Sequence, residues 1–227
     1  MLIWCVHDIV PGPARQPWEI SDRTLERAIS AHLARGYEFV PTDSARWYEP
    51  GTILLSVDDG TGGAARWLSG RALDFGLSAA YFAVTGWLDQ PPPRSPEHAY
   101  RTLASWDDVA RLQDVGHLIG SHSQSHVRLA GEPDGRIWQE LTSSRERLRA
   151  VTGSPVAHFA APYGSLSPRV MALAGQAGYE TVSSTEPGGN LGTGGRLPRV
   201  LKRLVLRSDR PALGLPDATR SDRGATT

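Results

Sequence analysis

Two aspartates stand side by side after a short apolar run. Ile53, Leu54 and Leu55 predict a buried strand, and Asp58 and Asp59 follow it closely. Adjacent carboxylates at such a point repel each other unless a cation or a proton compensates their charge. Asp-Asp-Gly is also ordinary turn chemistry, in which both acids are simply solvated. The pair therefore poses the question of what neutralises it.

A pair of histidines, His122 and His126, follows another apolar stretch. Histidines four residues apart meet on one face if the segment makes a helical turn, and this spacing suits a single metal ion. The chain has only seven histidines, so the pair favours a site over two unrelated surface residues. Asp58 or Asp59 would complete a set of two histidines and one acid, and the other aspartate would be a base that takes a proton from water. We expect one divalent ion, zinc first, with cobalt, nickel, manganese or iron as alternatives.

A third cluster, Pro162-Tyr163-Gly164, also follows a predicted strand. A tight turn of this kind can aim a backbone N–H at a developing oxyanion. A turn of proline, an aromatic residue and glycine is also commonly structural. The cluster supports a catalytic site only together with the two preceding ones.

The elements that must position these residues alternate along the chain between strands and helices. Such alternation predicts a parallel sheet, either open or closed into an α/β barrel, and in a barrel the carboxyl ends of the strands form the active face. Ser21 and Ser105 are predicted helix N-caps, the latter with Asp108 three residues on. We expect strands at 2–6, 37–40, 52–57, 78–84, 117–120, 156–160, 179–183 and 197–206, helices near 21–33, 65–75, 105–115, 134–151 and 170–177, and loops at 8–18, 90–96 and 188–195.

Composition narrows the classes of function. Of the 227 residues, 40% are hydrophobic, and 24 basic residues balance 24 acidic ones without a basic patch, which disfavours nucleic acid as a partner. Cys5 is the only cysteine, so a disulfide within the chain and a cysteine-rich metal site are both excluded. A nucleotide fold is disfavoured because no Gly-x-Gly-x-x-Gly or phosphate loop is present.

The beginning and the end of the sequence suggest one domain with a tail. The first apolar run lacks a basic flank and is too short for a signal peptide, and no stretch approaches the length of a membrane span, so we expect a cytoplasmic protein. We expect one catalytic domain over residues 1–208 and a disordered tail over 209–227, which is rich in Pro, Asp, Arg and Thr.

The order and spacing of these clusters resemble the polysaccharide deacetylases, carbohydrate esterase family 4, in its exopolysaccharide deacetylase-like branch. The motif Thr-Phe-Asp-Asp-Gly of that family is matched by 56–60, His-Ser/Thr-x-x-His by 122–126, and Arg-x-Pro-Tyr in part by 160–163. The stretches 7–10 and 36–40 are also similar to that branch, so the resemblance covers roughly residues 1–206. It implies a distorted (β/α)7 barrel and metal-dependent hydrolysis of an acetyl group. It also implies Asp58 as general base, Asp59, His122 and His126 as metal ligands, and the Tyr163 N–H as an oxyanion donor.

Two departures from the family pattern concern residues around the base and the acid. Ala160 stands where the family often has an arginine that holds the base, and Arg199 is a candidate to replace it. The late Leu-x-His motif, which supplies the general acid, is absent because no histidine follows His158. His7, at the end of the first strand, is a candidate acid, and a histidine satisfied by its own neighbours is the alternative.

The function that we expect is removal of an acetyl group, N-acetyl before O-acetyl, from a carbohydrate or a sugar-like small molecule. An amidase acting on a non-sugar biosynthetic intermediate is one alternative. A degenerate domain that binds sugar or metal without turnover is another. Retention of both aspartates and both histidines opposes the degenerate domain, since a mere binder has no need of a base. The sequence indicates no oligomeric state.

Overall fold

A curled sheet of parallel strands forms the centre of the molecule. The computed structural model describes residues 1–40, 49–90, 102–190 and 199–209. Its main strands are β1 (Leu2–Val6), β4 (Glu38–Phe39), β5 (Thr52–Val57), β6 (Ala79–Ala83), β7 (Leu118–Ser121), β8 (His158–Ala160), β9 (Thr181–Ser183), β10 (Arg199–Leu201) and β11 (Leu204–Val205). They lie in the order β10-β9-β8-β7-β6-β5-β1-β11, and β4 pairs with the first residues of β5. A small second sheet pairs β2 (Asp8–Val10) with β3 (Glu19–Ser21).

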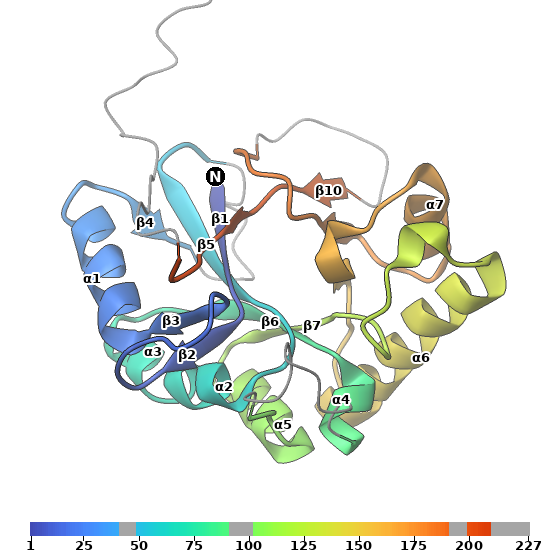
Figure 1. The fold of residues 1–227 in the computed structure, drawn as a ribbon, viewed down its shortest axis with the longest axis horizontal. Helices are drawn as coiled ribbons and strands as arrows, with labels where there is room; N and C mark the ends of the chain where they lie inside the picture. Colours follow the sequence, from blue (N-terminus) through green and yellow to red (C-terminus); the bar gives the residue numbers. More distant parts are fainter. Residues whose placement is uncertain (41–48, 91–101, 191–198, 210–227) are drawn as a thin grey trace, which may run out of the picture.

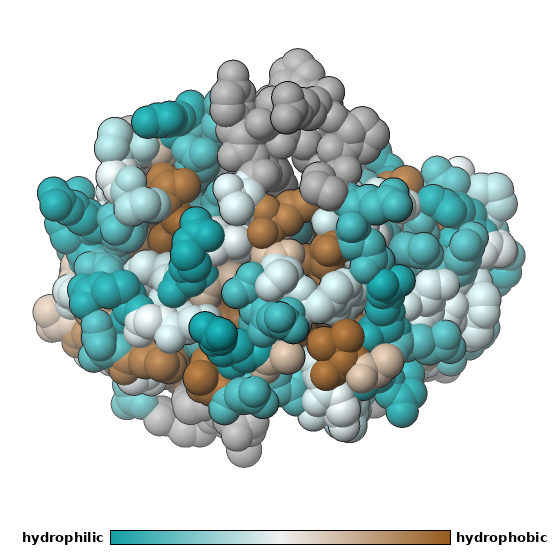
Figure 2. Space-filling model, turned by 90° about the horizontal axis from the view of Figure 1, so that it is seen from below, coloured by the Kyte–Doolittle hydropathy of each residue, from teal (hydrophilic) through white to brown (hydrophobic). Residues whose placement is uncertain are grey.

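Helices line the outside of the curled sheet (Figure 1). Ser21 and Ser105 are N-caps, as predicted, and Ser105 forms a capping box with Asp108. The face seen in Figure 2 is mostly hydrophilic with small separate hydrophobic patches, because these helices turn their apolar sides to the sheet. The helices are α1 (Asp22–Leu33), α2 (Gly62–Leu68), α3 (Arg71–Asp74), α4 (Thr85–Asp89), α5 (Trp106–Asp114), α6 (Asp134–Thr152) and α7 (Pro168–Gln176), with 3-10 turns η1 (Leu129–Gly131) and η2 (Pro162–Gly164).

The two edges of the sheet are brought together by the chain itself. β10 and β11 are its outermost strands, yet only Lys202 and Arg203 separate them in sequence. Three peptide steps span at most about 11 Å, so the sheet must curl until its edges nearly meet. The Arg203 side chain is completely buried, because this short crossing carries it into the interior of the half-barrel.

The central strands of the sheet, such as β5 and β6, are buried on both faces, as expected for parallel strands. On β5, Ile53, Leu55 and Val57 belong to the large core under the helices. Leu54 belongs to a smaller core that also contains Ile3 and Leu201. Alternate side chains of β5 thus pack into the outer core and into the barrel interior.

The predicted barrel class is confirmed, with local differences. β2 and β3 lie within or next to the predicted loop 8–18, and the single helix expected at 65–75 is divided into α2 and α3. The last expected strand, 197–206, is divided into β10 and β11 on opposite edges. Residues 91–96, 191–195 and 210–227 of the predicted loops and tail lie outside the described residues. No helix in the described part of the chain is long and apolar enough to cross a membrane.

Candidate active site and metal centre

The predicted site residues meet at the carboxyl ends of neighbouring strands. His7 follows β1, Asp58 and Asp59 follow β5, and His122 follows β7. β1, β5, β6 and β7 are parallel neighbours, so their carboxyl ends share one rim of the barrel. The rim collects two acids and three histidines, since His126 joins them from the loop after β7.

Asp59, His122 and His126 form a compact group of donors suited to a metal ion. Asp59 Oδ1 lies 3.4 Å from His122 Nε2 and 3.2 Å from His126 Nε2. One ligand atom from each residue lies within 4.8 Å of the other two. His122 Nδ1 lies 2.8 Å from the carbonyl oxygen of Ala160, so Nδ1 carries the proton and Nε2 keeps its lone pair for an ion. Two histidines and one carboxylate are a donor set typical of hydrolytic zinc sites, and the residues present fit such an ion.

The backbone around these ligands adopts conformations that L-residues rarely take. Asp59, Ser123 and His126 have positive φ angles of 74°, 68° and 59°. The Ser123 hydroxyl accepts a hydrogen bond of 2.9 Å from the N–H of His126. The His126 ring lies 4.7 Å from the ring of Trp87 and 4.6 Å from that of Tyr163, measured between centroids. Left-handed residues of this kind cluster at functional sites, where neighbouring contacts compensate for their strain.

Asp58 has a different partner from Asp59. Both of its oxygens accept hydrogen bonds of 2.7 Å from the two terminal nitrogens of Arg203, and both side chains are buried. Burial acts to raise the pKa of Asp58, but the charge of Arg203, helped by His122, outweighs burial and lowers the pKa to about 2. A carboxylate held at both oxygens by a guanidinium is a poor metal ligand and remains ionised at neutral pH.

His7 and Cys5 also lie beside Asp58. The Cys5 thiol donates to Asp58 Oδ2 at 3.5 Å, and a ring nitrogen of His7, the Cys5 sulfur and an Asp58 oxygen all lie within 4.8 Å of one another. Burial raises the pKa of the Cys5 thiol, which therefore stays protonated. A protonated thiol and the nearby guanidinium of Arg203 make this second cluster unsuitable for a cation.

The arginine beside Asp58 is Arg203 and not the expected Arg199. Arg199 begins β10 and is exposed, whereas Arg203 enters the interior four residues later. Its guanidinium also donates to the carbonyl oxygen of Ser184 and lies 5.7 Å from the centre of the Phe82 ring. The sequence held one signal for it: Lys202 and Arg203 interrupt the apolar residues of 200–206, and a charge buried there requires a partner of opposite charge.

Tyr163 lies where the third cluster predicts it, beside the histidines. It has a φ of 58° within η2, and its side chain is partly exposed. Arg128 lies 4.2 Å from the centre of its ring. Gly164 follows with a φ of 64°, and a Cβ there would approach the Thr185 hydroxyl to 2.2 Å, so the turn requires glycine.

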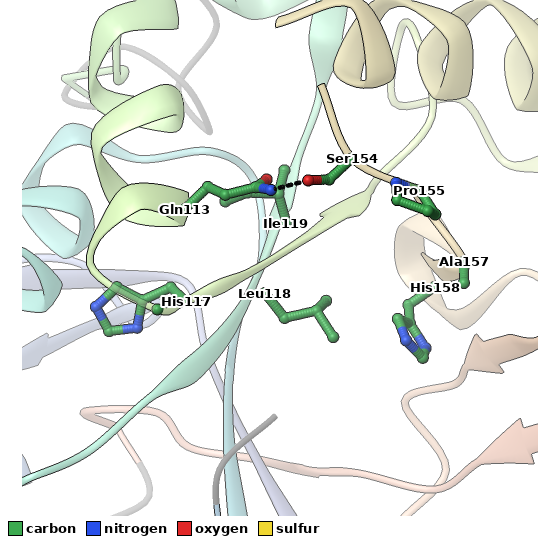
Figure 3. A pocket seen from close by; sticks show the side chains of 9 residues that line it. Gln113, His117, Leu118, Ile119, Ser154, Pro155, Ala157 and His158 are labelled. Atoms are coloured by element: carbon green, nitrogen blue, oxygen red, sulfur yellow. Dashed lines mark hydrogen bonds between the residues drawn. The ribbon is translucent and has the colours of Figure 1, made fainter. Parts of the chain in front are cut away.

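A cavity of about 360 Å³ lies at the opposite end of the sheet, beside the start of β7 and β8 (Figure 3). His117 and His158 line it. His117 Nδ1 accepts from the N–H of Ala79, and its Nε2 donates to the carbonyl oxygen of Leu68. Both ring nitrogens of His117 thus serve the fold, and this cavity is separate from the rim that carries the two aspartates.

The fold and the rim define an α/β barrel with a candidate metal centre and an arginine-held carboxylate. The family model for polysaccharide deacetylases matches residues 47–182, more than half of the sequence. The chain belongs to the polysaccharide deacetylase family.

Curated relatives match over a shorter segment. Chitin deacetylase 2 of Saccharomyces cerevisiae is 36% identical over 76 residues, which is 34% of this chain and 24% of that protein. Peptidoglycan-N-acetylmuramic acid deacetylase PdaA of Bacillus subtilis is 33% identical over 75 residues, which is 33% of this chain and 28% of that protein. The matches span about a quarter of the length of these relatives.

Solved structures match over almost the whole chain. IcaB from Ammonifex degensii has a TM-score of 0.77 at 18% identity, covering 92% of this chain and 93% of that one. The deacetylase PplD of Streptococcus pyogenes, in complex with acetate, has a TM-score of 0.75 at 16% identity, covering 95% and 96%. At these identities the likeness shows the fold, and it confirms the predicted barrel.

Proposed function

We propose that this protein is a metal-dependent deacetylase that hydrolyses an N-acetyl group of a carbohydrate. One observation carries the proposal: two adjacent aspartates at the barrel rim have different partners. Asp59 faces two histidine nitrogens, and Asp58 is held by Arg203. This arrangement supports Asp59 as ligand and Asp58 as base. In this proposal Arg203 neutralises Asp58, and a bound ion would neutralise Asp59.

Asp59, His122 and His126 would hold the ion. When bound, a divalent ion would supply Lewis acidity, which polarises the acetyl carbonyl and eases deprotonation of water. Asp58 would accept the proton of the attacking water at a carboxylate oxygen, and Arg203 would keep that carboxylate ionised and fixed in orientation.

His7 and Tyr163 would complete the reaction. His7 stands beside Asp58 at the rim and would donate a proton to the departing amine. An imidazole has a reference pKa of about 6.5, which suits donation near neutral pH. The backbone N–H of Tyr163, in a turn next to the His126 ring, would donate to the oxyanion of the tetrahedral intermediate.

The substrate proposed is an N-acetylated sugar. The names of the relatives support this class, since they refer to chitin and to N-acetylmuramic acid. A structural neighbour from Aggregatibacter actinomycetemcomitans, 18% identical with a TM-score of 0.75, is described as a de-N-acetylase.

Acetate release from a substrate panel tests the proposal. The panel contains N-acetylglucosamine oligomers, an O-acetylated sugar and an N-acetylated amine that is not a sugar. We expect acetate from the oligomers after Zn²⁺ is restored to metal-free protein, and none from the His122→Ala variant. Preferred cleavage of the non-sugar amide would overturn the substrate class. Tight metal binding without acetate from any compound would indicate a binding domain.

A further inference from the structure

The first turn of α4 donates two hydrogen bonds to the loop that joins the two histidine ligands. The N–H of Thr85 donates to the carbonyl oxygen of Ser123 at 3.2 Å, and the N–H of Gly86 donates to that of Gln124 at 2.8 Å. A Cβ on Gly86 would approach the Gln124 carbonyl oxygen to 2.5 Å, so only glycine allows this contact. The carbonyl groups of the loop are thus fixed against the first turn of α4.

The carboxylate of Glu140, in α6, accepts hydrogen bonds from the same loop. Its Oε2 accepts from the N–H of Gln124 at 2.9 Å and from the N–H of Ser125 at 2.8 Å. Its Oε1 accepts from the Ser125 hydroxyl and, at 2.8 Å, from Arg136 Nη2. The Glu140 side chain is completely buried, so these four donors replace all of its contact with water.

The contacts with α4 and Glu140 hold the segment that lies between the two histidine ligands. Gln124 and Ser125 lie between His122 and His126, and Ser123 and His126 have positive φ angles. Released from its partners, such a loop would relax to more favourable dihedral angles and turn His126 away from His122.

We propose that Glu140 is a positioning residue for the metal centre, because it fixes the loop so that the two imidazoles meet at one point. This inference rests on the proposed metal site and assigns a residue that touches neither the ion nor the substrate. Glu140 lies within α6, outside the His-Ser/Thr-x-x-His motif, so the motif does not point to it.

The isosteric variant Glu140→Gln gives a sharp test. Either orientation of the new amide places its NH₂ group against donors, the two backbone N–H groups on one side or Arg136 on the other. We expect Zn²⁺ binding to metal-free protein, measured by calorimetry, to weaken by about 10- to 100-fold, the usual effect of removing an outer partner of a metal site. Glu146→Gln is the matched control, because Glu146 is exposed on the same helix.

The double variant Arg136→Met/Glu140→Gln tests whether the Zn²⁺ affinity lost in Glu140→Gln can be restored. Without the guanidinium, the amide NH₂ can face the Ser125 hydroxyl, which can turn and accept, while the amide oxygen serves the two backbone N–H groups. We expect the double variant to recover part of the lost Zn²⁺ affinity. A general loss of structure would show no such recovery.

Hydrogen exchange of the metal-free protein supplies a second measurement. The amides of Gln124 and Ser125 should exchange faster in Glu140→Gln than in wild type, and those of the Glu146→Gln control should not. Zn²⁺ affinity equal in Glu140→Gln and Glu146→Gln, or unchanged exchange of the two amides, would overturn the role of Glu140. Failure of the wild type to bind Zn²⁺ would instead overturn the proposed metal site and the inference with it.

Discussion

Neighbouring residues can differ sharply in electrostatic environment, and Asp58 and Asp59 illustrate this. Asp58 continues the line of β5 into the barrel interior, where Arg203 meets it. Asp59 turns at a φ of 74° and points its carboxylate at two imidazoles. The sequence predicted the acids and the histidines because each follows an apolar strand. It did not predict Arg203, because the partner of a buried charge depends on a crossing between two distant strands.

Replacing Arg203 tests how much its ion pair with Asp58 contributes to the stability of the fold. Arg203→Met leaves the Asp58 carboxylate buried without its cation, and breaking a buried ion pair in this way typically costs about 3–5 kcal/mol. We expect that loss in the free energy of unfolding of the metal-free protein, measured in urea. The double variant Asp58→Asn/Arg203→Met should recover part of the loss, since neither position then carries a charge. A single variant as stable as wild type would show that the pair contributes nothing to the fold.

The acid role of His7 makes a separate prediction. His7→Ala should keep the metal and lower kcat for an N-acetyl amide, whose leaving group needs a proton, by roughly 10²–10⁴. The defect should be smaller for an activated ester, whose leaving group departs unprotonated. Rates of acetate release from both substrates measure the contrast. An equal loss on both would assign His7 a positional role.

β2 approaches the start of α2 closely at Gly63. A Cβ on Gly63 would come within 2.3 Å of the Asp8 carboxylate, so this glycine permits the contact. Burial, helped by the charge of Glu19, raises the pKa of Asp8 to about 6 despite hydrogen bonds from Thr61 and Ile9. A carboxyl group with a raised folded-state pKa stabilises the fold at low pH and loses that contribution as pH rises through the folded value.

Asp8→Asn should remove this dependence on pH. The folded pKa of about 6 exceeds the reference value of 3.8, so the wild type should lose about 3 kcal/mol relative to the variant between about pH 4 and pH 8. Urea unfolding of both proteins across this range measures the difference. A difference in stability that stays constant with pH would show that the pKa of Asp8 is not raised in the folded protein.

Elements with a strong local signal were predicted well, and those fixed by distant contacts were not. β5 has its predicted limits, 52–57, because an apolar run in a parallel sheet leaves little choice. α5 begins at its predicted cap, Ser105. The pairing of β2 with β3 was not predicted. It joins short segments on either side of a proline-rich stretch, and neither segment has a local pattern typical of a strand.

At the scale of the whole molecule, the crossing from β10 to β11 both closes the half-barrel and delivers Arg203 to the site. The alternation of strands and helices predicted the barrel class, and the solved structures of similar fold confirm it. The division of 197–206 between two edges was not predicted, because the pattern of apolar residues in this stretch does not reveal where the chain changes its partner strand. The fold thereby links the closure of the sheet to the orientation of Asp58.

Comparison of Asp58→Asn with Asp59→Asn tests whether the two adjacent aspartates divide the roles of base and metal ligand. Metal content and acetate release from N-acetylglucosamine oligomers are measured for both variants after Zn²⁺ is supplied to metal-free protein. We expect Asp58→Asn to keep its Zn²⁺ and to lose roughly 10²–10⁴ in kcat, whereas Asp59→Asn should lose the Zn²⁺ itself. Equal loss of Zn²⁺ in both variants, or full acetate release by Asp58→Asn, would contradict it.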